Sequence, residues 1–395
     1  MNTKLKKILI IIIIILILVL AGLLVYKFVI KKGGGGEGQP SGQFPSGGAG
    51  QEGQGAGGAG GAGGQVGPQA EQKIKAISQE AVYSPTITAD KNQVIYYLRS
   101  NGNIRQSNFD GSNLNQVSST FLENLIKVLW SPNKDKEITI FEDGLGNVSK
   151  YLYDHTTNKA LPLNKYMNYV VWSPDAKKII YQYQNDFTGD NTISLANPDG
   201  SGYLILLKTR MKDLIFDWPK GSDVFFQEKP TGLVPSSLYS LNTLTKSFSE
   251  VISNINGFSV KWSADGSKIL YSKTGLTGNG IGIFVADRNG SNSKSLEIAT
   301  LVEKCAWSQD LRYIYCAIPK NINEAKILPD DFYKGTFLAN DEFYKINIET
   351  GDKTKLLADS QMVEVYDAND LFLSPQEDYL FFVNKTNGLL YSIKL

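Results

Sequence analysis

The stretch Trp172-Ser173-Pro174-Asp175-Ala176-Lys177-Lys178-Ile179-Ile180-Tyr181 combines an aromatic anchor, a turn and a short apolar strand. The same pattern recurs along most of the chain, with successive anchors 42 to 66 residues apart. The anchors are Tyr83, Trp130, Trp172, Trp218, Trp262, Trp307 and Leu373. Repetition at a nearly constant period in this range is typical of propellers and solenoids.

Each repeat is interpreted as four short antiparallel strands, which we name A, B, C and D. In the Trp172 repeat they are expected at 168–172, 178–183, 192–196 and 203–207, with turn residues between them. These stretches are rich in β-branched and aromatic residues, which favour strands. A sheet of four short strands cannot bury both faces alone, so several must pack side by side in a ring. The sequence therefore predicts an all-β fold made of four-stranded blades.

The two ends of the repeat region predict how the ring closes. The last repeat supplies strands A, B and C, the third at 389–393, and the chain ends at Leu395 before a fourth. Residues 73–78 precede the first repeat and are expected to supply that missing outer strand. Seven anchors and this closure predict a seven-bladed β-propeller. Six blades are the alternative, because Tyr83 and Leu373 are the weakest anchors.

The repeats resemble those of TolB and of the propeller domain of prolyl oligopeptidases, over residues 74–395. The resemblance rests on the stretch quoted above and on Trp262-Ser263-Ala264-Asp265-Gly266-Ser267-Lys268-Ile269-Leu270-Tyr271. It implies a protein-binding platform, a gating domain of a peptidase or a sugar-handling enzyme. The peptidase hydrolase domain, with its Gly-x-Ser-x-Gly elbow, has no counterpart in this sequence. The resemblance therefore favours a binding module.

The N-terminal region predicts a membrane anchor. Residues 1–7 are polar and basic, and 8–30 form an apolar run of 23 residues, long enough to cross a bilayer as a helix. The alternative, a cleaved signal peptide, lacks an Ala-x-Ala site after the run. A slight excess of positive charge ahead of the run favours a cytoplasmic N-terminus. We therefore expect a single-pass protein of the cytoplasmic membrane whose C-terminal domain is extracytoplasmic.

Residues 31–72 are expected to be a disordered linker. Of the 36 residues in 33–68, 18 are glycine, so this segment cannot bury enough apolar surface to fold. Gly53-Gln54-Gly55-Ala56-Gly57-Gly58 matches a dinucleotide-binding pattern, but no strand precedes it and no helix follows it. The domain organisation is thus a cytoplasmic segment (1–7), a transmembrane helix (8–30), a linker (31–72) and a propeller (73–395).

Charge and motifs exclude several functions. Residues 74–395 carry 33 Lys and Arg against 36 Asp and Glu, a net charge near −3, and a nearly neutral domain is poorly suited to bind nucleic acid. Metal sites built from Cys and His are excluded by the counts, and no cofactor motif is found. The single histidine, His155, is expected to be a solvated loop residue. No catalytic residue is predicted, and the Trp anchors are expected to pack between blades.

The two cysteines, Cys305 and Cys316, lie on strands A and B of one repeat, on either side of the turn. Directly opposed residues in a hairpin come within about 4.5 to 5.5 Å, which is compatible with a disulfide. The alternative is a pair of buried free thiols. The sequence leaves both open.

The B-to-C loops differ most between repeats, and they emerge on one face together with the D-to-A connections. The longest is 319–341, and long loops in compact domains are often functional. The residues predicted to contact a partner are Phe187, Leu233, Leu328, Asp330, Asp331, Phe332 and Tyr333. The alternative is that the longest loop packs across its own blade or plugs the central channel.

These observations predict a non-enzymatic module that binds an envelope protein, peptide or glycan, anchored in the membrane through residues 8–30. The rival is a propeller-type hydrolase or lyase acting on envelope polysaccharide, which would require converging carboxylates or a metal. A scaffold that clusters through its membrane helices receives little support, since the helix lacks a Gly-x-x-x-Gly motif.

Overall fold

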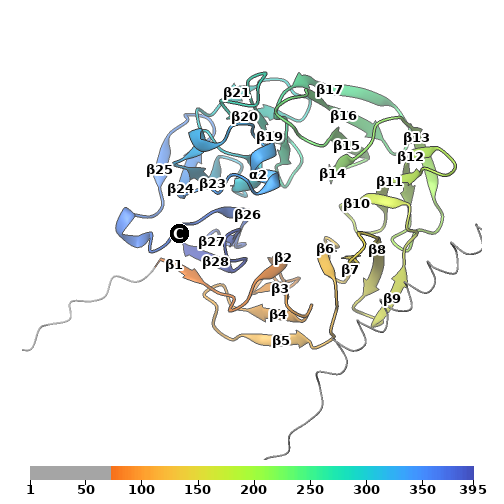
Figure 1. The fold of residues 1–395 in the computed structure, drawn as a ribbon, viewed down its shortest axis with the longest axis horizontal. Coiled ribbons are helices and arrows are strands. Elements are labelled where there is room, and N and C mark those ends of the chain that lie inside the picture. The colour runs from red at the N-terminus through yellow and green to blue at the C-terminus, as the bar shows by residue number, and fades with distance from the viewer. Residues whose placement is uncertain (1–72) are drawn as a thin grey trace, which may run out of the picture. The chain divides into compact units, whose positions relative to one another are not determined.

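The computed structural model describes residues 73–395, which form seven four-stranded antiparallel sheets arranged as blades around an axis (Figure 1). The predicted all-β, seven-bladed propeller is confirmed, and the six-bladed alternative is wrong. The predicted N-terminal segment, transmembrane helix and linker (1–72) lie outside the described residues. Within 73–395, no helix is both long and apolar enough to cross a membrane.

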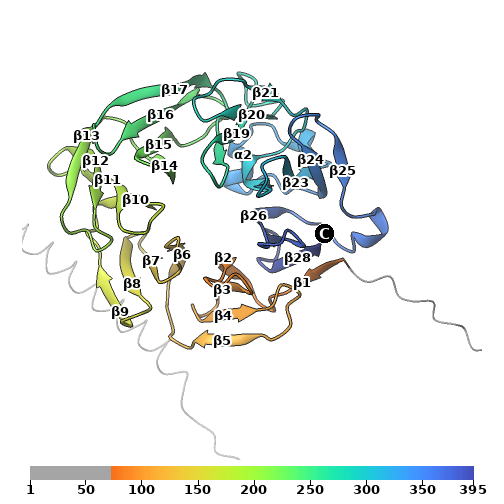
Figure 2. The same cartoon turned by 180° about the vertical axis from the view of Figure 1, so that it is seen from behind.

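The blades follow one another around the ring in chain order, each running from an inner strand A to an outer strand D (Figures 1 and 2). Blade 1 comprises β2 (Val82–Ile87), β3 (Val94–Leu98), β4 (Ile104–Ser107) and β5 (Asn115–Ser118). Blade 2 comprises β6 (Leu125–Trp130), β7 (Lys136–Glu142), β8 (Val148–Asp154) and β9 (Lys159–Pro162). Blade 3 comprises β10 (Met167–Trp172), β11 (Ile179–Asn185), β12 (Asp190–Ala196) and β13 (Leu204–Lys208). Blade 4 comprises β14 (Leu214–Lys220), β15 (Asp223–Glu228), β16 (Ser236–Asn242) and β17 (Phe248–Ile255). Blade 5 comprises β18 (Val260–Trp262), β19 (Lys268–Lys273), β20 (Gly282–Asp287) and β21 (Lys294–Ser295). Blade 6 comprises β22 (Cys305–Trp307), β23 (Tyr313–Pro319), β24 (Asp341–Asn347) and β25 (Lys353–Lys355).

Blade 7 closes the ring with both ends of the propeller. It comprises β26 (Ala368–Leu373), β27 (Tyr379–Asn384), β28 (Leu390–Lys394) and, as its outer strand, β1 (Ile74–Ala76). β1 pairs antiparallel with β28, and the N–H of Lys394 donates to the carbonyl of Lys73 at 2.9 Å. The closure predicted for residues 73–78 is therefore confirmed, with a strand of three residues.

The serine of the repeated motif shapes the turn between strands A and B. Ser173 is buried, and its hydroxyl accepts a hydrogen bond from the N–H of Lys178 at 2.9 Å and donates to Asp175 at 2.6 Å. Ser263 makes the equivalent hydrogen bonds to Lys268 and Asp265 in blade 5. The side chain thus satisfies backbone groups of a five-residue turn, which explains why Ser and Asp recur there.

Three of the Trp anchors connect one blade to the preceding one. The indole N–H of Trp172 donates to the carbonyl of Leu129 at 2.9 Å, and that of Trp307 donates to the carbonyl of Lys261 at 3.2 Å. Trp130 makes the equivalent bond to Ser84 in blade 1. These anchors therefore pack between blades, because each fills the interface and satisfies a backbone oxygen there.

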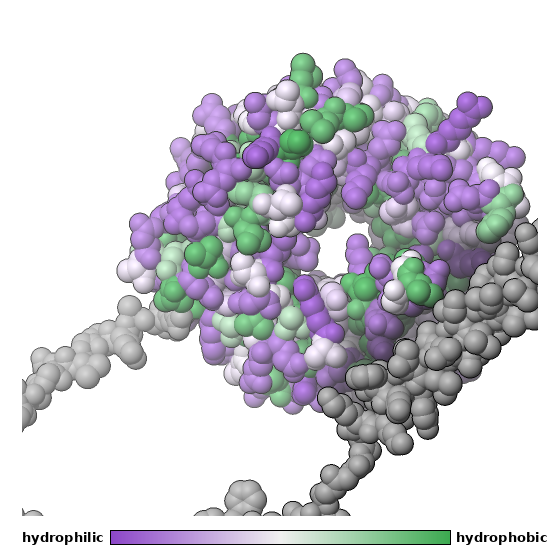
Figure 3. Space-filling view, viewed as in Figure 1, coloured by the Kyte–Doolittle hydropathy of each residue, from purple (hydrophilic) through white to green (hydrophobic). Residues whose placement is uncertain are grey.

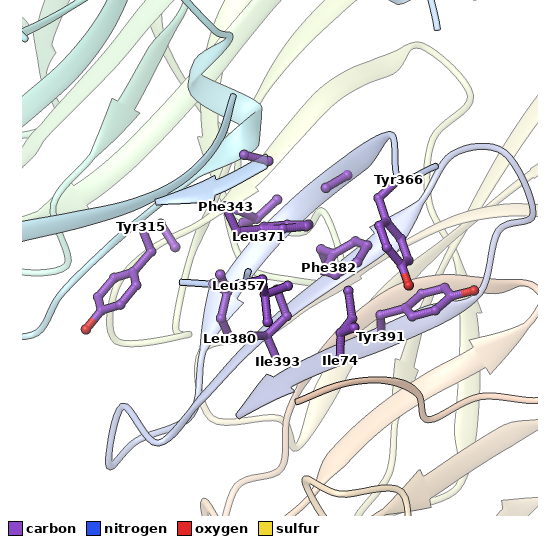
Figure 4. Packing of buried hydrophobic residues seen from close by; sticks show 13 residues of the cluster. Ile74, Tyr315, Phe343, Leu357, Tyr366, Leu371, Leu380, Phe382, Tyr391 and Ile393 are labelled. Carbon is purple, nitrogen blue, oxygen red and sulfur yellow. The ribbon is translucent and has the colours of Figure 1, made fainter. Parts of the chain in front are cut away.

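The hydrophobic core is divided among the interfaces between blades. Figure 4 shows the cluster shared by blades 6 and 7, where the rings of Phe343 and Phe382 lie 4.9 Å apart and Ile74 of β1 is buried beside them. The A strands surround the axis, and Figure 3 shows an opening there on a face that is mainly hydrophilic. In blade 6, Cys305 and Cys316 pair directly across β22 and β23 and form a disulfide.

Candidate functional site

The long loop between β23 and β24 is well packed. It contains η3 (Ile322–Glu324), a 3-10 helix, and α2 (Asp330–Lys334). Leu328 and Phe332 are only 2% and 3% exposed, and they pack with Ile281, Leu301 and Phe337 in a small cluster of their own. Side chains buried to this degree cannot touch a partner. Leu328 and Phe332 therefore stabilise the loop, contrary to the prediction that they form a contact surface.

Asp330 and Asp331 hold the same loop in place. Asp330 accepts hydrogen bonds from the N–H of Gly232 at 2.8 Å and from the hydroxyl of Thr231 at 3.0 Å, both in blade 4. Asp331 accepts the N–H of Ile327 at 2.9 Å, and this hydrogen bond is the main reason that the pKa of Asp331 lies below its ordinary value. Both carboxylates accept hydrogen bonds from other residues of the chain, so their role is structural.

Two glycines let the loop lie across blades 4 and 5. A Cβ added to Gly232 would lie 2.3 Å from the carbonyl oxygen of Leu328, and one added to Gly278 would lie 2.8 Å from Ile327. The N–H of Leu328 donates to the carbonyl of Gly278 at 2.7 Å. Close approach of backbones requires glycine at these positions. The loop thus packs on two neighbouring blades, whereas the alternative interpretation places it across its own blade or in the central channel.

A buried charge cluster ties the end of the loop to blade 7. The ammonium of Lys304 lies 2.6 Å from Asp341 and 2.7 Å from Asp367, and all three side chains are fully or almost fully buried. Burial raises the pKa of Asp341 to about 6, although Lys304 acts against this shift. The ammonium of Lys385 lies 3.6 Å from the centre of the Phe332 ring. The contact of Lys385 with the Phe332 ring holds α2 against blade 7.

The remaining predicted residues are exposed to different degrees. Tyr333 is 39% exposed, and its hydroxyl donates to Glu303. Phe187 is 91% exposed and Leu233 is 54% exposed, each in the middle of a B-to-C loop. Their side chains are available to a partner, and that role stays a prediction.

Phe187 and Leu233 belong to a larger set. Blades 2 to 6 each present an exposed leucine or phenylalanine within the B-to-C loop, and we call this set the apolar crown: Leu145, Phe187, Leu233, Leu276 and Leu338. Every strand B ends on the same face of the ring, so the crown residues share that face. At the turns of the opposite face, the exposed large apolar residues in the described chain are Leu114, Tyr203 and Leu244.

A groove of about 1190 Å³ lies between blades 1 and 2. One side is the segment 117–124, which connects the two blades, and the other is the face of β7 and β8. Pockets that hold small molecules usually have volumes of about 300 to 1,000 Å³, so this groove is larger than most. The groove is therefore large enough for a ligand of several rings.

Two residues of β7 explain why this interface is open. The residue paired with the anchor Trp130 is Glu137, and two positions further on is Thr139. In sister blades the same two positions hold a buried isoleucine and a buried tyrosine: Ile179 and Tyr181 in blade 3, Ile269 and Tyr271 in blade 5. An acidic and a small residue thus replace an aliphatic and an aromatic one, and the interface is left unfilled.

Glu137 forms the floor of the groove. Its side chain is 1% exposed and accepts a hydrogen bond from the hydroxyl of Tyr97 in blade 1, while its second oxygen lies 3.2 Å from His155 Nε2. Burial and the carboxylate raise the pKa of Tyr97 far above its ordinary value, so this hydroxyl keeps its proton and donates. A buried carboxylate without partners would cost several kcal/mol, and these two groups supply the partners.

His155 is held at the groove by aromatic rings. Its ring stacks on Trp130, with centroids 5.9 Å apart and planes 12° apart, and meets the edge of Tyr153 at 4.9 Å. Its side chain is 26% exposed. His155 lies in the turn after β8, as expected for a loop residue, but its ring is packed and only partly solvated because the turn places it over the anchor of its own blade.

Tyr97, Glu137 and His155 form one hydrogen-bonded trio that sequence reasoning missed. A signal for Glu137 exists in the sequence, because aligning the repeats places it where sister blades have isoleucine. No comparable signal marks Tyr97 or His155, since their meeting depends on the packing of blade 1 against blade 2. Within residues 73–395, no group of three or more His, Cys, Asp or Glu side chains is placed to hold a metal ion.

Comparison with known proteins finds similarity in the fold alone. No family model matches the chain, and no curated protein matches it. An oligogalacturonate lyase in complex with manganese superposes with a TM-score of 0.56 at 14% identity, covering 82% of this chain and 93% of that chain. The propeller domain of the Trilobed protease from Pyrococcus furiosus gives 0.52 at 12% identity, over 80% and 96% of the two chains.

TolB from Acinetobacter baumannii is also among the structural neighbours, with a TM-score of 0.44 at 14% identity over 72% of this chain and 65% of that chain. The Pyrococcus propeller is described as having an open velcro topology, whereas here β1 closes the ring. The described chain is thus a closed seven-bladed propeller with neighbours among lyase, protease and TolB propellers.

Proposed function

We propose that this protein is a non-enzymatic binding module of the cell envelope, anchored in the membrane through residues 8–30, whose extracytoplasmic propeller captures a protein or peptide. The observation that carries the proposal is the apolar crown. Leu145, Phe187 and Leu276 are 88%, 91% and 84% exposed, each at the tip of a different loop on one face. Burying such apolar side chains on association with a partner is favourable.

The longest of the loops that carry the crown is packed against neighbouring blades, which favours a fixed binding surface there. The longest loop is packed by Leu328 and Phe332 and tied to blade 4 through Asp330. A surface that is ordered before binding loses less entropy when a partner docks. The residues predicted from the sequence therefore fall into two roles, with Phe187 and Leu233 offered to a partner and the buried ones holding the face.

The disulfide supports an extracytoplasmic location. Cys305 and Cys316 are joined, and both side chains are completely buried. Structural disulfides persist in oxidising compartments and are rare in the cytosol. This agrees with the expectation that the domain after residue 30 lies outside the cytoplasm.

A second candidate, a hydrolase or lyase acting on envelope polysaccharide, rests on the trio in the groove. Tyr97 and His155 each lie within hydrogen-bonding reach of Glu137, so a phenol, a carboxylate and an imidazole meet at one site. Incubation of the protein with isolated envelope polysaccharide, followed by assay of new reducing ends, tests it. Cleavage that disappears in Glu137→Gln would favour the enzyme over the binding module.

Site-specific crosslinking tests the binding module. A photoreactive residue is placed at position 187 of the full-length protein in its native envelope, and in a matched sample at position 244. Leu244 is a suitable control because it is 81% exposed on the opposite face. We expect a discrete crosslinked partner from position 187 and none from position 244.

The crown must also be required for that capture. In the protein with the crosslinker at 187, Leu276→Ser is expected to reduce the crosslinked product several-fold, because it removes apolar contact area without disturbing the core. Equal products from positions 187 and 244, or a product unaffected by Leu276→Ser, would refute binding through the crown.

A further inference from the structure

We propose that the groove between blades 1 and 2 is a binding site for an uncharged oligosaccharide. The proposal stands apart from the crown, because the groove lies between two blades and is built by different residues. Its origin is the pair Glu137 and Thr139, which replace the isoleucine and tyrosine that fill this interface in sister blades. An interface that is left open buries less apolar surface than the filled interfaces of sister blades, and this lowers the stability of the fold at that point.

The walls of the groove are aromatic. Tyr151 lies on β8 opposite Thr139, and it meets Phe141 edge to face with ring centroids 5.8 Å apart. Tyr151 is 37% exposed and Phe121, on the connecting segment, is 65% exposed. Rings with one face open to solvent offer the flat apolar surface on which the C–H face of a pyranose packs.

The rim supplies many neutral hydrogen-bonding groups. It is lined by side-chain hydroxyls and amides, which match the closely spaced hydroxyls of a sugar better than they match an apolar ligand. These groups belong to Ser118, Ser119, Thr120, Asn124, Asn147 and Asn158. Below the rim, the partly exposed ring of His155 borders the groove, and Glu137, buried with both oxygens paired, fixes the position of that ring.

The charges around the groove define the ligand further. Of the residues in the described chain that line it, none is Lys or Arg, whereas Glu123, Glu137 and Asp143 are acidic. A ligand with carboxylates, sulfates or phosphates would meet only repulsion there. A polyuronate is therefore disfavoured, and a neutral sugar is the class that both the aromatic walls and the polar rim fit.

The size of the groove indicates an oligosaccharide. At about 1190 Å³ it exceeds the usual range of 300 to 1,000 Å³ for small-molecule pockets, and it extends from the connecting segment to the floor trio. A single sugar ring would leave much of this space wet. A chain of a few sugar units would contact the walls and the rim together.

Calorimetry with defined sugars tests the site. The full-length protein, in a detergent without a sugar headgroup, is titrated with chitotriose, cellotriose and mannotriose, and separately with trigalacturonate and trilysine. We expect at least one neutral trisaccharide to bind with a millimolar or lower dissociation constant. Binding by trigalacturonate or trilysine alone would overturn the proposal, as would the absence of binding by all three neutral sugars.

Two variants locate the binding. Thr139→Tyr restores the aromatic residue that Tyr181 and Tyr271 provide in sister blades, so it fills the groove with a side chain that this fold accommodates. We expect it to weaken sugar binding at least tenfold with an unchanged or higher melting temperature. Tyr151→Ala removes a wall and is expected to weaken binding by a similar factor.

The matched control is Tyr203→Ala, which removes an exposed tyrosine, 68% accessible, from a turn of blade 3. Its sugar affinity is expected to stay within twofold of the unaltered protein. If Thr139→Tyr folds normally and binds the sugar as tightly as the unaltered protein, the site is not in this groove. Loss of sugar binding leaves the crown untouched, so crosslinking from position 187 is expected to continue.

Discussion

Ser78 and Leu390 are 312 residues apart in the chain, yet the N–H of Leu390 donates a hydrogen bond of 2.9 Å to the Ser78 hydroxyl. Beside them, the N–H of Ile77 donates to the carbonyl of Leu390 at 2.8 Å. The start and the end of the propeller are thus joined by side-chain and backbone contacts as well as by strand pairing. The seven blades consequently form a closed ring, in which each blade packs between two neighbours.

Removing the closure strand should destabilise the whole ring. A chain that begins at residue 80 lacks Ile74 and Ile77, which are 1% and 5% exposed. Burial of two such side chains contributes about 3 to 6 kcal/mol. We expect urea denaturation to show a loss of at least about 3 kcal/mol. A chain that begins at residue 69, where the compact unit starts, is the control and should keep the stability of the full propeller.

The Trp262 anchor is expected to be among the most sensitive core positions. Its ring lies 4.2 Å from that of Phe225 in blade 4, and the guanidinium of Arg288 lies 5.8 Å away. Trp262→Ala should lower the free energy of unfolding by about 3 to 5 kcal/mol. Leu244→Ala, at an exposed turn, should change it by less than about 0.5 kcal/mol. A melting temperature unaffected by Trp262→Ala would contradict the packing between blades 4 and 5.

The disulfide should contribute measurable stability. It closes a loop with a sequence separation of 11, and chain-entropy arguments give about 2 to 3 kcal/mol for such a loop. The double variant Cys305→Ala/Cys316→Ala is therefore expected to unfold at lower denaturant concentration. Because both cysteines are fully buried, mild reductant should leave the native bond intact, and mass spectrometry after alkylation checks this. Rapid labelling of both thiols in the native protein would argue against that burial.

Two buried carboxylates should make stability fall as the pH rises from about 5 to about 7. Burial raises the pKa of Asp217 to about 7 and that of Asp341 to about 6, from ordinary values near 3.8. In that window the folded protein holds protons that the unfolded chain has released, so raising the pH favours unfolding. Asp217→Asn removes one such group and is expected to flatten the profile and to stabilise the protein at pH 8, by an amount on the order of 2 to 4 kcal/mol. An identical pH profile in this variant would exclude Asp217 as a source.

The seven-bladed architecture could be predicted from the sequence because the same motif recurs along the chain. The anchors Trp130, Trp172 and Trp307 donate to the preceding blade as inter-blade packing requires, and the serine of the motif caps a turn of fixed length. The turn depends on residues close together in the chain, and the Trp contacts recur at each repeat because they join equivalent positions of neighbouring blades. The strand β1 could be predicted because the last repeat lacks a fourth strand.

The candidate sites depend on contacts between repeats, which periodicity does not encode. Leu328 and Phe332 look like loop residues in the sequence, but the loop folds back on Gly232 and Gly278 of two other blades. His155 follows a strand and reads as solvated. Its packed position depends on Trp130, 25 positions earlier, and on the buried carboxylate of Glu137.

The seam at β1 also determines how the propeller would respond to tension. Any pull that travels along the chain ahead of Lys73 reaches the domain at β1, which is joined to β28 by three residue pairs. A strand loaded from its end loses its hydrogen bonds one after another, so this strand yields before β27 and β28, which are longer and lie inside the blade. Its detachment would leave blade 7 with three strands and open the circle. The strand that closes the propeller is thus also its weakest point under mechanical load.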